Sequence, residues 1–205
     1  MTEQRIVAVA AGLSTPSSTR LLADRLSGAV DTALREAGDT AAVETVELRE
    51  HARALGEAMA AGFPTGELKR AVDAVAGADG VIAVTPVFNA SYSGLFKSFF
   101  DLVDADDLHG TPVLIGATGG SPRHSLVLEH AMRPMFAYLR ATVAPTAVYA
   151  ASEDWGGGGD VHAALTDRVS RAGGELAALV SGRPKRERPD PYEEPVPFER
   201  LLRGE

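Results

Sequence analysis

The stretch VIAVTPVFNASYSGLFKSFFDLV, residues 81–103, decides the fold of this chain. Its first four residues are apolar with no alternating polar position, which predicts a strand buried on both faces. Thr85-Pro86 predicts the end of that strand. Apolar side chains then return at helical spacing, at positions 95, 96, 99, 100 and 103. A buried strand that leads through a polar loop into a helix is where open α/β sheets bind ligands.

Predicted strands and helices alternate along the whole chain. Strands are expected at 5–11, 42–48, 81–84, 111–117 and 143–150, and helices at 22–38, 51–63, 67–78, 95–103, 123–140 (kinked or restarted at Pro134) and 161–181. This order predicts an α/β fold, a flavodoxin-like three-layer sandwich. Its five-stranded parallel sheet has the order 2-1-3-4-5, with helices on both faces.

Composition excludes several classes of function. The chain has 205 residues, a formal net charge of −8 and no cysteine. The acidic balance argues against partners such as nucleic acid or an anionic membrane. The absence of cysteine excludes disulfides, thiolate nucleophiles and iron–sulfur centres, and the histidine spacing predicts no metal site. No apolar run approaches the ~20 residues of a membrane span, and no secretory signal is recognised, so we expect a cytoplasmic protein.

The loop after the first strand, residues 12–19, reads GLSTPSST and is rich in hydroxyl groups. A helix N-terminus that follows such a loop favours a phosphate group, because its free N–H groups carry partial positive charge. The same residues are equally typical of a simple N-cap, and both interpretations stay open. The loop is neither a P-loop nor a dinucleotide fingerprint. Because Pro16 replaces the second glycine of a nucleophile elbow, the loop does not indicate a serine hydrolase.

Two further loops follow the third and fourth strands, at 85–92 and 117–121. Gly119 and Gly120 allow backbone N–H groups to approach a ligand closely, although a plain glycine turn explains them as well. In the order 2-1-3-4-5 the ends of strands 1, 3 and 4 lie together. One phosphate loop and two loops that offer backbone groups to a planar ring specify a mononucleotide, and FMN fits that outline.

These motifs resemble the NADPH-dependent FMN reductase family, over roughly residues 5–181. The resemblance rests on SxPSST at 14–19, TPVFNASYSGLFKSFFD at 85–101 and ATGGS at 117–121. It is strongest to the actinobacterial-type FMN reductases with the sequence TPVFxASYSGLFK. The resemblance implies FMN and NADPH (or NADH) as cofactors. It also implies an FMN-binding domain at 1–181. Residues 182–205 are rich in proline and charge, and this composition predicts a separate C-terminal tail.

The resemblance further assigns site residues. The FMN phosphate would be held by Ser14, Ser17, Ser18 and Thr19, the ring and ribityl chain by Pro86, Val87, Phe88, Asn89, Ala90 and Ser91, and the ring again by Thr118, Gly119 and Gly120. Many relatives carry Tyr where this chain has Phe88, so stacking rather than a hydroxyl role is implied there. The family reaction is hydride transfer from a nicotinamide to flavin N5, which requires no side-chain acid or base. We therefore assign no catalytic residue.

The leading hypothesis is an NAD(P)H-dependent FMN reductase. It would supply reduced flavin to a monooxygenase or reduce quinones, azo dyes or chromate. A flavodoxin-type electron carrier and a degenerate flavin-binding regulator are the alternatives. Family relatives imply a homodimer or homotetramer. Apolar residues in the tail, at 196–198 and 201–202, are expected to pack on a partner subunit, with a solvated, disordered tail as the equal alternative.

Three further predictions concern side chains near these motifs. Arg123, His124 and Arg133 are candidates to receive a pyridine-nucleotide phosphate. Lys97 is interpreted as an exposed helix lysine, with a contact to flavin or to a partner subunit as the alternative. The phenylalanines at 96, 99 and 100 have helical spacing, which favours core packing over a cofactor cage.

Overall fold

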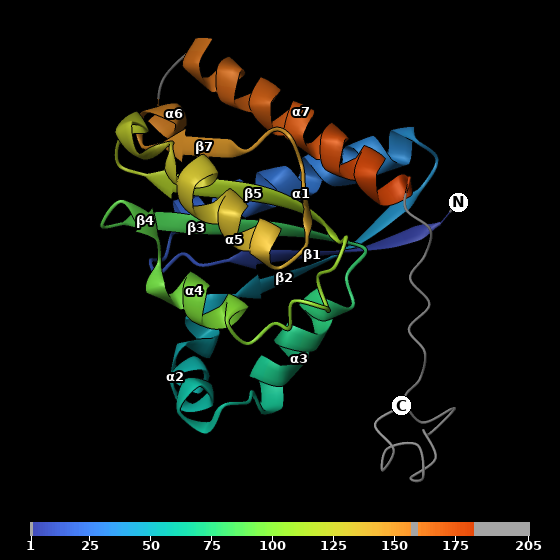
Figure 1. Cartoon of the computed structure of the whole chain (residues 1–205). Helices are drawn as coiled ribbons and strands as arrows, with labels where there is room; N and C mark the ends of the chain where they lie inside the picture. Colours follow the sequence, from blue (N-terminus) through green and yellow to red (C-terminus); the bar gives the residue numbers. More distant parts are fainter. Residues whose placement is uncertain (1, 157–159, 183–205) are drawn as a thin grey trace.

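A computed structural model describes residues 2–156 and 160–182, which form a parallel sheet between two layers of helices (Figure 1). The strands are β1 Glu3–Ala10, β2 Thr40–Glu47, β3 Gly80–Phe88, β4 Ser91–Tyr92, β5 Pro112–Gly119, β6 Thr142–Val143 and β7 Val148–Ala151. The order is β2-β1-β3-β5-β6, and β7 also pairs with β5. With β6 and β7 counted as one strand, this confirms the predicted order 2-1-3-4-5.

The helices are α1 Ser18–Glu36, α2 Ala52–Ala61, α3 Gly66–Ala76, α4 Gly94–Phe100, α5 Arg133–Tyr138, α6 Glu153–Gly156 and α7 Asp160–Ser181. Short 3₁₀ turns lie at Leu48–His51 and Pro122–His124, and a π-helical turn at Leu128–Met132. The predicted tail, apart from Gly182, lies outside the described residues.

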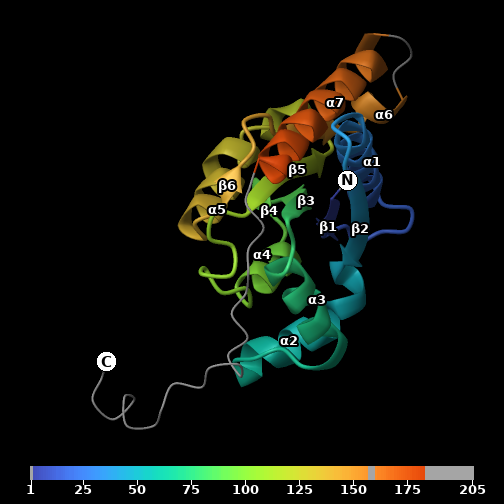
Figure 2. The ribbon, with the colours of Figure 1, turned by 90° about the vertical axis from the view of Figure 1, so that its right-hand side faces the viewer.

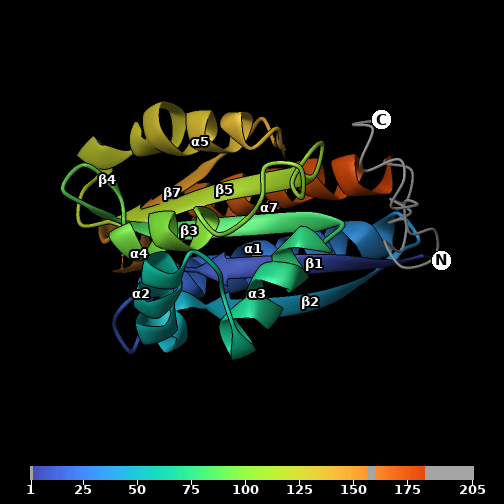
Figure 3. The ribbon, with the colours of Figure 1, turned by 60° about the horizontal axis from the view of Figure 1, so that its bottom comes forward.

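Both faces of the sheet are buried, as the apolar strands predicted. On β1, Val7 and Val9 pack in the core with α2, α3, α4 and α5, whereas Ile6, Ala8 and Ala10 pack in the core with α1 and α7. Figures 2 and 3 show these two helical layers from other sides. The carboxyl ends of the parallel strands therefore lie at one edge of the sheet, together with the loops that follow them.

The predicted end of the third strand at Thr85-Pro86 is wrong, because β3 continues to Phe88. Its pairing with β1 ends at Val84, whereas its pairing with β5 runs on to Pro86 opposite Thr118. A proline is tolerated where a strand loses one neighbour, since its missing N–H breaks no ladder there. The strand then turns back into β4 as an antiparallel hairpin.

The predicted fifth strand, 143–150, is interrupted between β6 and β7. Arg133 donates to the carbonyls of Ala144 and Pro145, each at 3.1 Å. From the other helical layer, Glu175 accepts from the Thr146 N–H at 2.6 Å and from its hydroxyl at 2.7 Å. These side chains satisfy backbone groups that a continuous ladder would have paired, so the interruption costs little.

Two predicted segments differ in detail. The helix expected at 123–140 is a 3₁₀ turn, a π turn and then α5. Because Pro134 has no N–H, it cannot donate within a continuous helix and lies in the first turn of α5, which begins at Arg133. The predicted restart of the helix at this proline is confirmed. Trp155, expected in a loop with the glycines 156–159, lies in α6, and residues 157–159 are outside the described part.

The three phenylalanines of α4 are core residues, as predicted. Phe96 and Phe99 are fully buried, and Phe100 nearly so. Their rings pack at tilted or edge-to-face angles, with Phe136 of α5 against Phe96 and Phe100. Aromatic pairs favour this geometry. The cluster fixes α4 and α5 under the β3–β4 hairpin.

Candidate functional site

The ends of β1, β3 and β5 meet around one cavity of about 460 Å³. Ten of the thirteen predicted site residues line it, and they come from three separate segments of the chain. These ten are Ser14, Ser17, Ser18, Thr19, Pro86, Val87, Phe88, Thr118, Gly119 and Gly120. Gly12, Leu13, Ser152 and Trp155 line it as well and were missed by the sequence analysis.

The first loop ends in a helix cap. Ser17 adopts extended backbone, and its side-chain oxygen accepts the Arg20 N–H at 3.2 Å, so Ser17 is the N-cap of α1. The cap uses a lone pair and leaves the hydroxyl proton free to donate elsewhere. Capping and phosphate binding are therefore compatible at this residue. The first turn of α1 contains no acidic residue, which leaves the positive end of the helix dipole uncompensated within its own helix.

Glycine is needed at position 12 because side-chain atoms of the first loop lie close to its backbone. A Cβ atom at this position would lie 2.0 Å from Ser17 Oγ and 3.0 Å from Thr19 Cβ. A side chain there would push the cap away from the helix. The signal in the sequence is slight: a single glycine directly after a buried strand.

A buried hydroxyl pair joins the first loop to the third. Thr19 Oγ1 and Thr118 Oγ1 are 2.8 Å apart, and both side chains are almost fully buried. Each hydroxyl satisfies the other at the wall of the cavity, which both residues line. This contact fixes the N-terminal turn of α1 against the end of β5.

The third loop is held by Tyr149 of β7. The Tyr149 hydroxyl donates to the Ser121 carbonyl oxygen at 2.8 Å. A Cβ at Gly119 would lie 2.1 Å from that hydroxyl oxygen, so glycine is needed where the tyrosine crosses the loop. Burial, and secondly the charge of Asp154, raise the pKa of the Tyr149 hydroxyl above its ordinary value.

The second loop is the β3–β4 hairpin. Thr85 Oγ1 accepts the Ser93 N–H at 3.0 Å, and Ser93 in turn caps α4 through the Phe96 N–H. Phe88 lines the cavity with 47 % of its surface exposed. The remaining predicted residues, Asn89, Ala90 and Ser91, lie at or beside the hairpin turn and do not line the cavity.

Trp155 closes the cavity on the side of α1. The guanidinium carbon of Arg25 lies 5.0 Å from the centre of the Trp155 ring, within cation–π range. The neighbouring Asp154 accepts the Ala151 N–H at 2.7 Å and pairs with Arg168, which anchors α6 to β7. Trp155 was missed because it is 35 residues beyond Gly120, the last predicted site residue.

None of the described residues that line the cavity carries a charged side chain. Positive charge comes from the N-terminus of α1 instead. Arg133 is not available for a coenzyme phosphate, because it bonds both carboxylate oxygens of Glu129, at 2.7 and 2.9 Å, in addition to its two carbonyl partners. Arg123 and His124 are exposed on the turn that follows Ser121. Lys97 pairs with Asp101 on the surface of α4, as an exposed helix lysine would.

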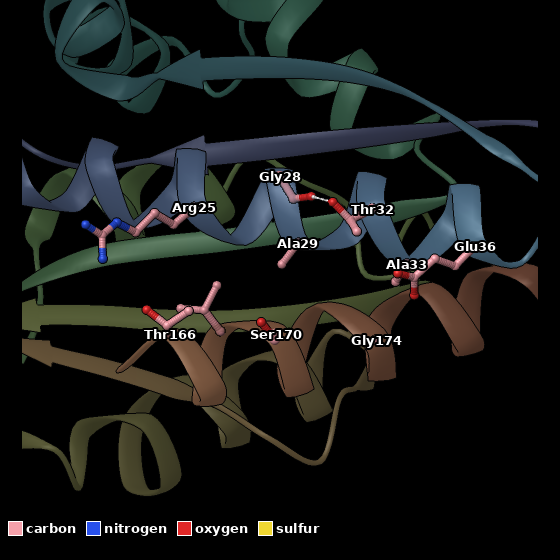
Figure 4. A pocket seen from close by; sticks show the side chains of 10 residues that line it. Arg25, Gly28, Ala29, Thr32, Ala33, Glu36, Thr166, Ser170 and Gly174 are labelled. Atoms are coloured by element: carbon pink, nitrogen blue, oxygen red, sulfur yellow. Dashed lines mark hydrogen bonds between the residues drawn. The ribbon is translucent and has the colours of Figure 1, made fainter. Parts of the chain in front are cut away.

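A larger cavity of about 530 Å³ lies between α1 and α7 (Figure 4). Gly28, Ala29 and Thr32 face it from α1, and Thr166, Ser170 and Gly174 from α7. It gathers no strand ends or loops. Beside it the two helices approach closely at Gly173, where a Cβ would lie 2.6 Å from Ala29 Cβ. The cavity at the strand ends is therefore the candidate site.

Within the described residues, no group of three histidine, aspartate or glutamate side chains is arranged to hold a metal ion. None of the helices in that part of the chain is long and apolar enough to cross a membrane.

Comparison with known proteins identifies what this arrangement resembles. A family profile described as NADPH-dependent FMN reductase matches residues 4–156. An FMN reductase (NADPH) from Pseudomonas aeruginosa is 36 % identical over 181 residues, covering 87 % of this chain and 94 % of the relative. The NADH-dependent FMN reductase SfnF from Pseudomonas fluorescens is 39 % identical over 153 residues, covering 74 % and 78 %.

Solved structures with a similar fold include an oxidoreductase and a flavodoxin. An oxidoreductase from Corynebacterium diphtheriae has a TM-score of 0.85 and 47 % identity, covering 89 % of this chain and 99 % of its own. A flavodoxin from the domain Archaea has a TM-score of 0.56 at 14 % identity, covering 88 % and 99 %. At that identity the likeness shows the fold alone.

Proposed function

The chain belongs to the NADPH-dependent FMN reductase family, and we propose that the cavity at the ends of β1, β3 and β5 is its FMN site. It is an NAD(P)H-dependent FMN reductase with a flavodoxin-like fold, and its small-molecule substrates are NAD(P)H and flavin. The assignment of FMN to this cavity is the proposal.

The residues of the cavity fit FMN. Gly120 lines the cavity, and a Cβ there would meet nothing within 4 Å, so its backbone is open to a ligand. Hydroxyl groups and the N-terminus of α1 suit a phosphate at one end. Apolar groups at Pro86, Val87 and Phe88 suit a flat ring at the other end, and the neighbouring peptide groups suit its polar edge.

The chain's own residues would then bind and orient. Ser14, Ser17, Ser18 and Thr19 would hold the phosphate, and Thr118, Gly119 and Gly120 would bind the polar edge of the ring. Asn89, Ala90 and Ser91 would reach the ring from the hairpin. When bound, FMN supplies N5 as the acceptor of the nicotinamide hydride. No side chain of the cavity is needed as an acid or base.

The main support for this proposal is that residues predicted from three separate segments line the same cavity. Ten residues picked from three segments of sequence, up to 106 positions apart, line a single cavity without a charged side chain. The experiment is anaerobic mixing of FMN-loaded protein with NADPH or NADH. We expect the visible flavin band to bleach. An unchanged band with tightly bound FMN would indicate the flavodoxin-type carrier instead.

The test of the site itself uses equilibrium binding. FMN should bind to the wild-type chain at micromolar or lower concentration, and riboflavin, which lacks the phosphate, should bind more weakly. A Ser18→Ala variant should lose FMN affinity, because the exposed Ser18 lines the cavity and is assigned to the phosphate end. Equal binding of both flavins to the wild-type chain would contradict the assignment of residues 14–19.

We further propose that the enzyme is a homodimer or homotetramer and passes reduced flavin to a monooxygenase in the cytoplasm. Support comes from two exposed apolar side chains: Phe88, which lines the cavity, and Leu126, which follows the 122–124 turn, are 47 % and 62 % exposed. Exposed apolar surface of this kind is typical of contact regions. Light scattering coupled to size exclusion tests the oligomer, and a chain that elutes as a monomer would exclude it.

A further inference from the structure

Tyr149 belongs to β7, a strand whose residues the proposed flavin assignment does not use. It stands opposite Ala117 in the β5–β7 register, just before the loop of Thr118, Gly119 and Gly120. The side chain is 5 % exposed. Its hydroxyl reaches over the loop to the Ser121 carbonyl at 2.8 Å. The tyrosine is therefore a brace between a neighbouring strand and the far end of this loop.

The loop is fixed at two points. At its start, the Thr118 hydroxyl lies 2.8 Å from that of Thr19, and at its end the Ser121 carbonyl accepts from Tyr149. Gly119 and Gly120 lie between these points and line the cavity. Two glycines in a row have wide conformational freedom, so the orientation of their peptide groups depends on what holds the flanking residues.

The fit between Tyr149 and Gly119 is close. A Cβ at Gly119 would lie 2.1 Å from the tyrosine oxygen and 3.2 Å from Cζ, whereas a Cβ at Gly120 would meet nothing within 4 Å. The hydroxyl thus crosses directly over the peptide that faces the cavity. Preorganised backbone groups bind a ligand better than mobile ones, because their orientation costs nothing on binding.

We propose that Tyr149 is a positioning residue for the flavin ring, acting through its hydrogen bond to Ser121 to orient the Gly119–Gly120 peptide groups. This inference rests on the proposed function, since it assumes that the ring end of FMN lies at these glycines. Tyr149 itself does not line the cavity.

The experiment compares Tyr149→Phe with Tyr138→Phe, a matched variant on the exposed surface of α5. FMN and riboflavin affinities are measured by quenching of flavin fluorescence, and the spectrum of bound flavin and its midpoint potential are recorded. We expect Tyr149→Phe to weaken both flavins by the same factor, about fivefold for one lost hydrogen bond. The spectrum and the potential should change as well. Tyr138→Phe should change none of these.

A double-mutant cycle with Gly119→Ala tests the route of the effect. In the wild-type background the new methyl group collides with the tyrosine oxygen, so flavin binding should fall more than tenfold. In the Tyr149→Phe background the collision with the oxygen is removed and only the 3.2 Å approach to Cζ is left, so the same substitution should cost clearly less. If Tyr149→Phe does not fold, Tyr149→His, which keeps a ring with a polar edge, takes its place, and it should again weaken both flavins equally.

Several outcomes would overturn the inference. These are unchanged affinity and potential in Tyr149→Phe, weakening of FMN without riboflavin, or strictly additive effects in the cycle. A lower melting temperature with normal flavin binding would mean a structural role alone. Failure of the wild-type chain to bind FMN would instead remove the proposed site.

Discussion

The hydroxyl oxygens of Thr19 and Thr118 lie 2.8 Å apart, and this contact joins the first turn of α1 to the end of β5 across 99 residues of sequence. Both side chains are buried, so each hydroxyl depends on the other. Thr118→Val should lower the free energy of unfolding by about 1–3 kcal/mol, because Thr19 keeps a buried hydroxyl without its partner.

Urea denaturation measures this change. The double variant Thr19→Val/Thr118→Val should cost less than the sum of the single variants, since it leaves no unpaired hydroxyl. Thr32→Val, at an exposed position of α1, is the control and should have little effect. Additive costs would show that the two hydroxyls do not act together.

Ser17 caps α1 and also lines the cavity. Ser17→Ala should destabilise the fold by about 1 kcal/mol through loss of the cap. It should also weaken FMN more than riboflavin, because the phosphate loses a donor. Ser93→Ala removes the matching cap of α4, which lies outside the cavity lining. That control should lower stability without changing the ratio of FMN to riboflavin affinity. The same ratio in both variants would exclude phosphate binding by Ser17.

Gly12 and Gly28 provide a paired test of glycine roles. Gly12→Ala places a methyl group 2.0 Å from Ser17 Oγ, so it should lower both stability and FMN affinity. Gly28 lies within α1 with open space around it, and Gly28→Ala should raise stability by about 0.5–1 kcal/mol. Thermal melts and fluorescence titrations measure both. Wild-type FMN binding by Gly12→Ala would show that the loop relaxes freely.

Arg123 remains a candidate for the coenzyme phosphate, and Arg133 is its control. Arg123→Ala should raise the KM for NADPH more than the KM for NADH, since the two coenzymes differ by one phosphate. Arg133→Ala should lower the melting temperature instead, because Arg133 pairs with Glu129 and holds the interruption between β6 and β7. Steady-state kinetics measure both KM values. If Arg123→Ala changes the KM for NADPH and the KM for NADH equally, Arg123 does not bind the coenzyme phosphate.

The turn between β3 and β4 contains two residues with left-handed backbone, Asn89 at φ 49° and Ala90 at φ 65°. Asparagine tolerates this region, but alanine is disfavoured there by roughly 1–2 kcal/mol. Ala90→Gly should therefore raise the free energy of unfolding by up to about 1 kcal/mol. Ala60→Gly, at an exposed position of α2, should lower it by about 1 kcal/mol. Urea denaturation measures both free energies of unfolding. If both variants change it in the same direction, the backbone at Ala90 is not strained.

The sequence by itself determined the layer structure and most of the candidate site. Strands such as 81–84 are apolar throughout, so they had to lie between two helical layers, and the alternation of elements predicted the order of the sheet. Polar and glycine-containing loops directly after those strands identified the three segments of the site, because parallel strand ends must meet at one edge. The family resemblance then assigned residues within them, ten of which line the cavity.

Only the tertiary structure decided the rest. Whether β3 stops at Pro86 depends on where its neighbour β1 ends, and the break between β6 and β7 depends on Arg133 and Glu175. Trp155 and Tyr149 reach the site region from the far edge of the sheet, through contacts with Arg25 and Ser121. Local patterns report the burial and backbone preference of each segment. Local patterns do not show which distant side chain will contact a given residue, because those contacts depend on how the packed layers bring the segments together.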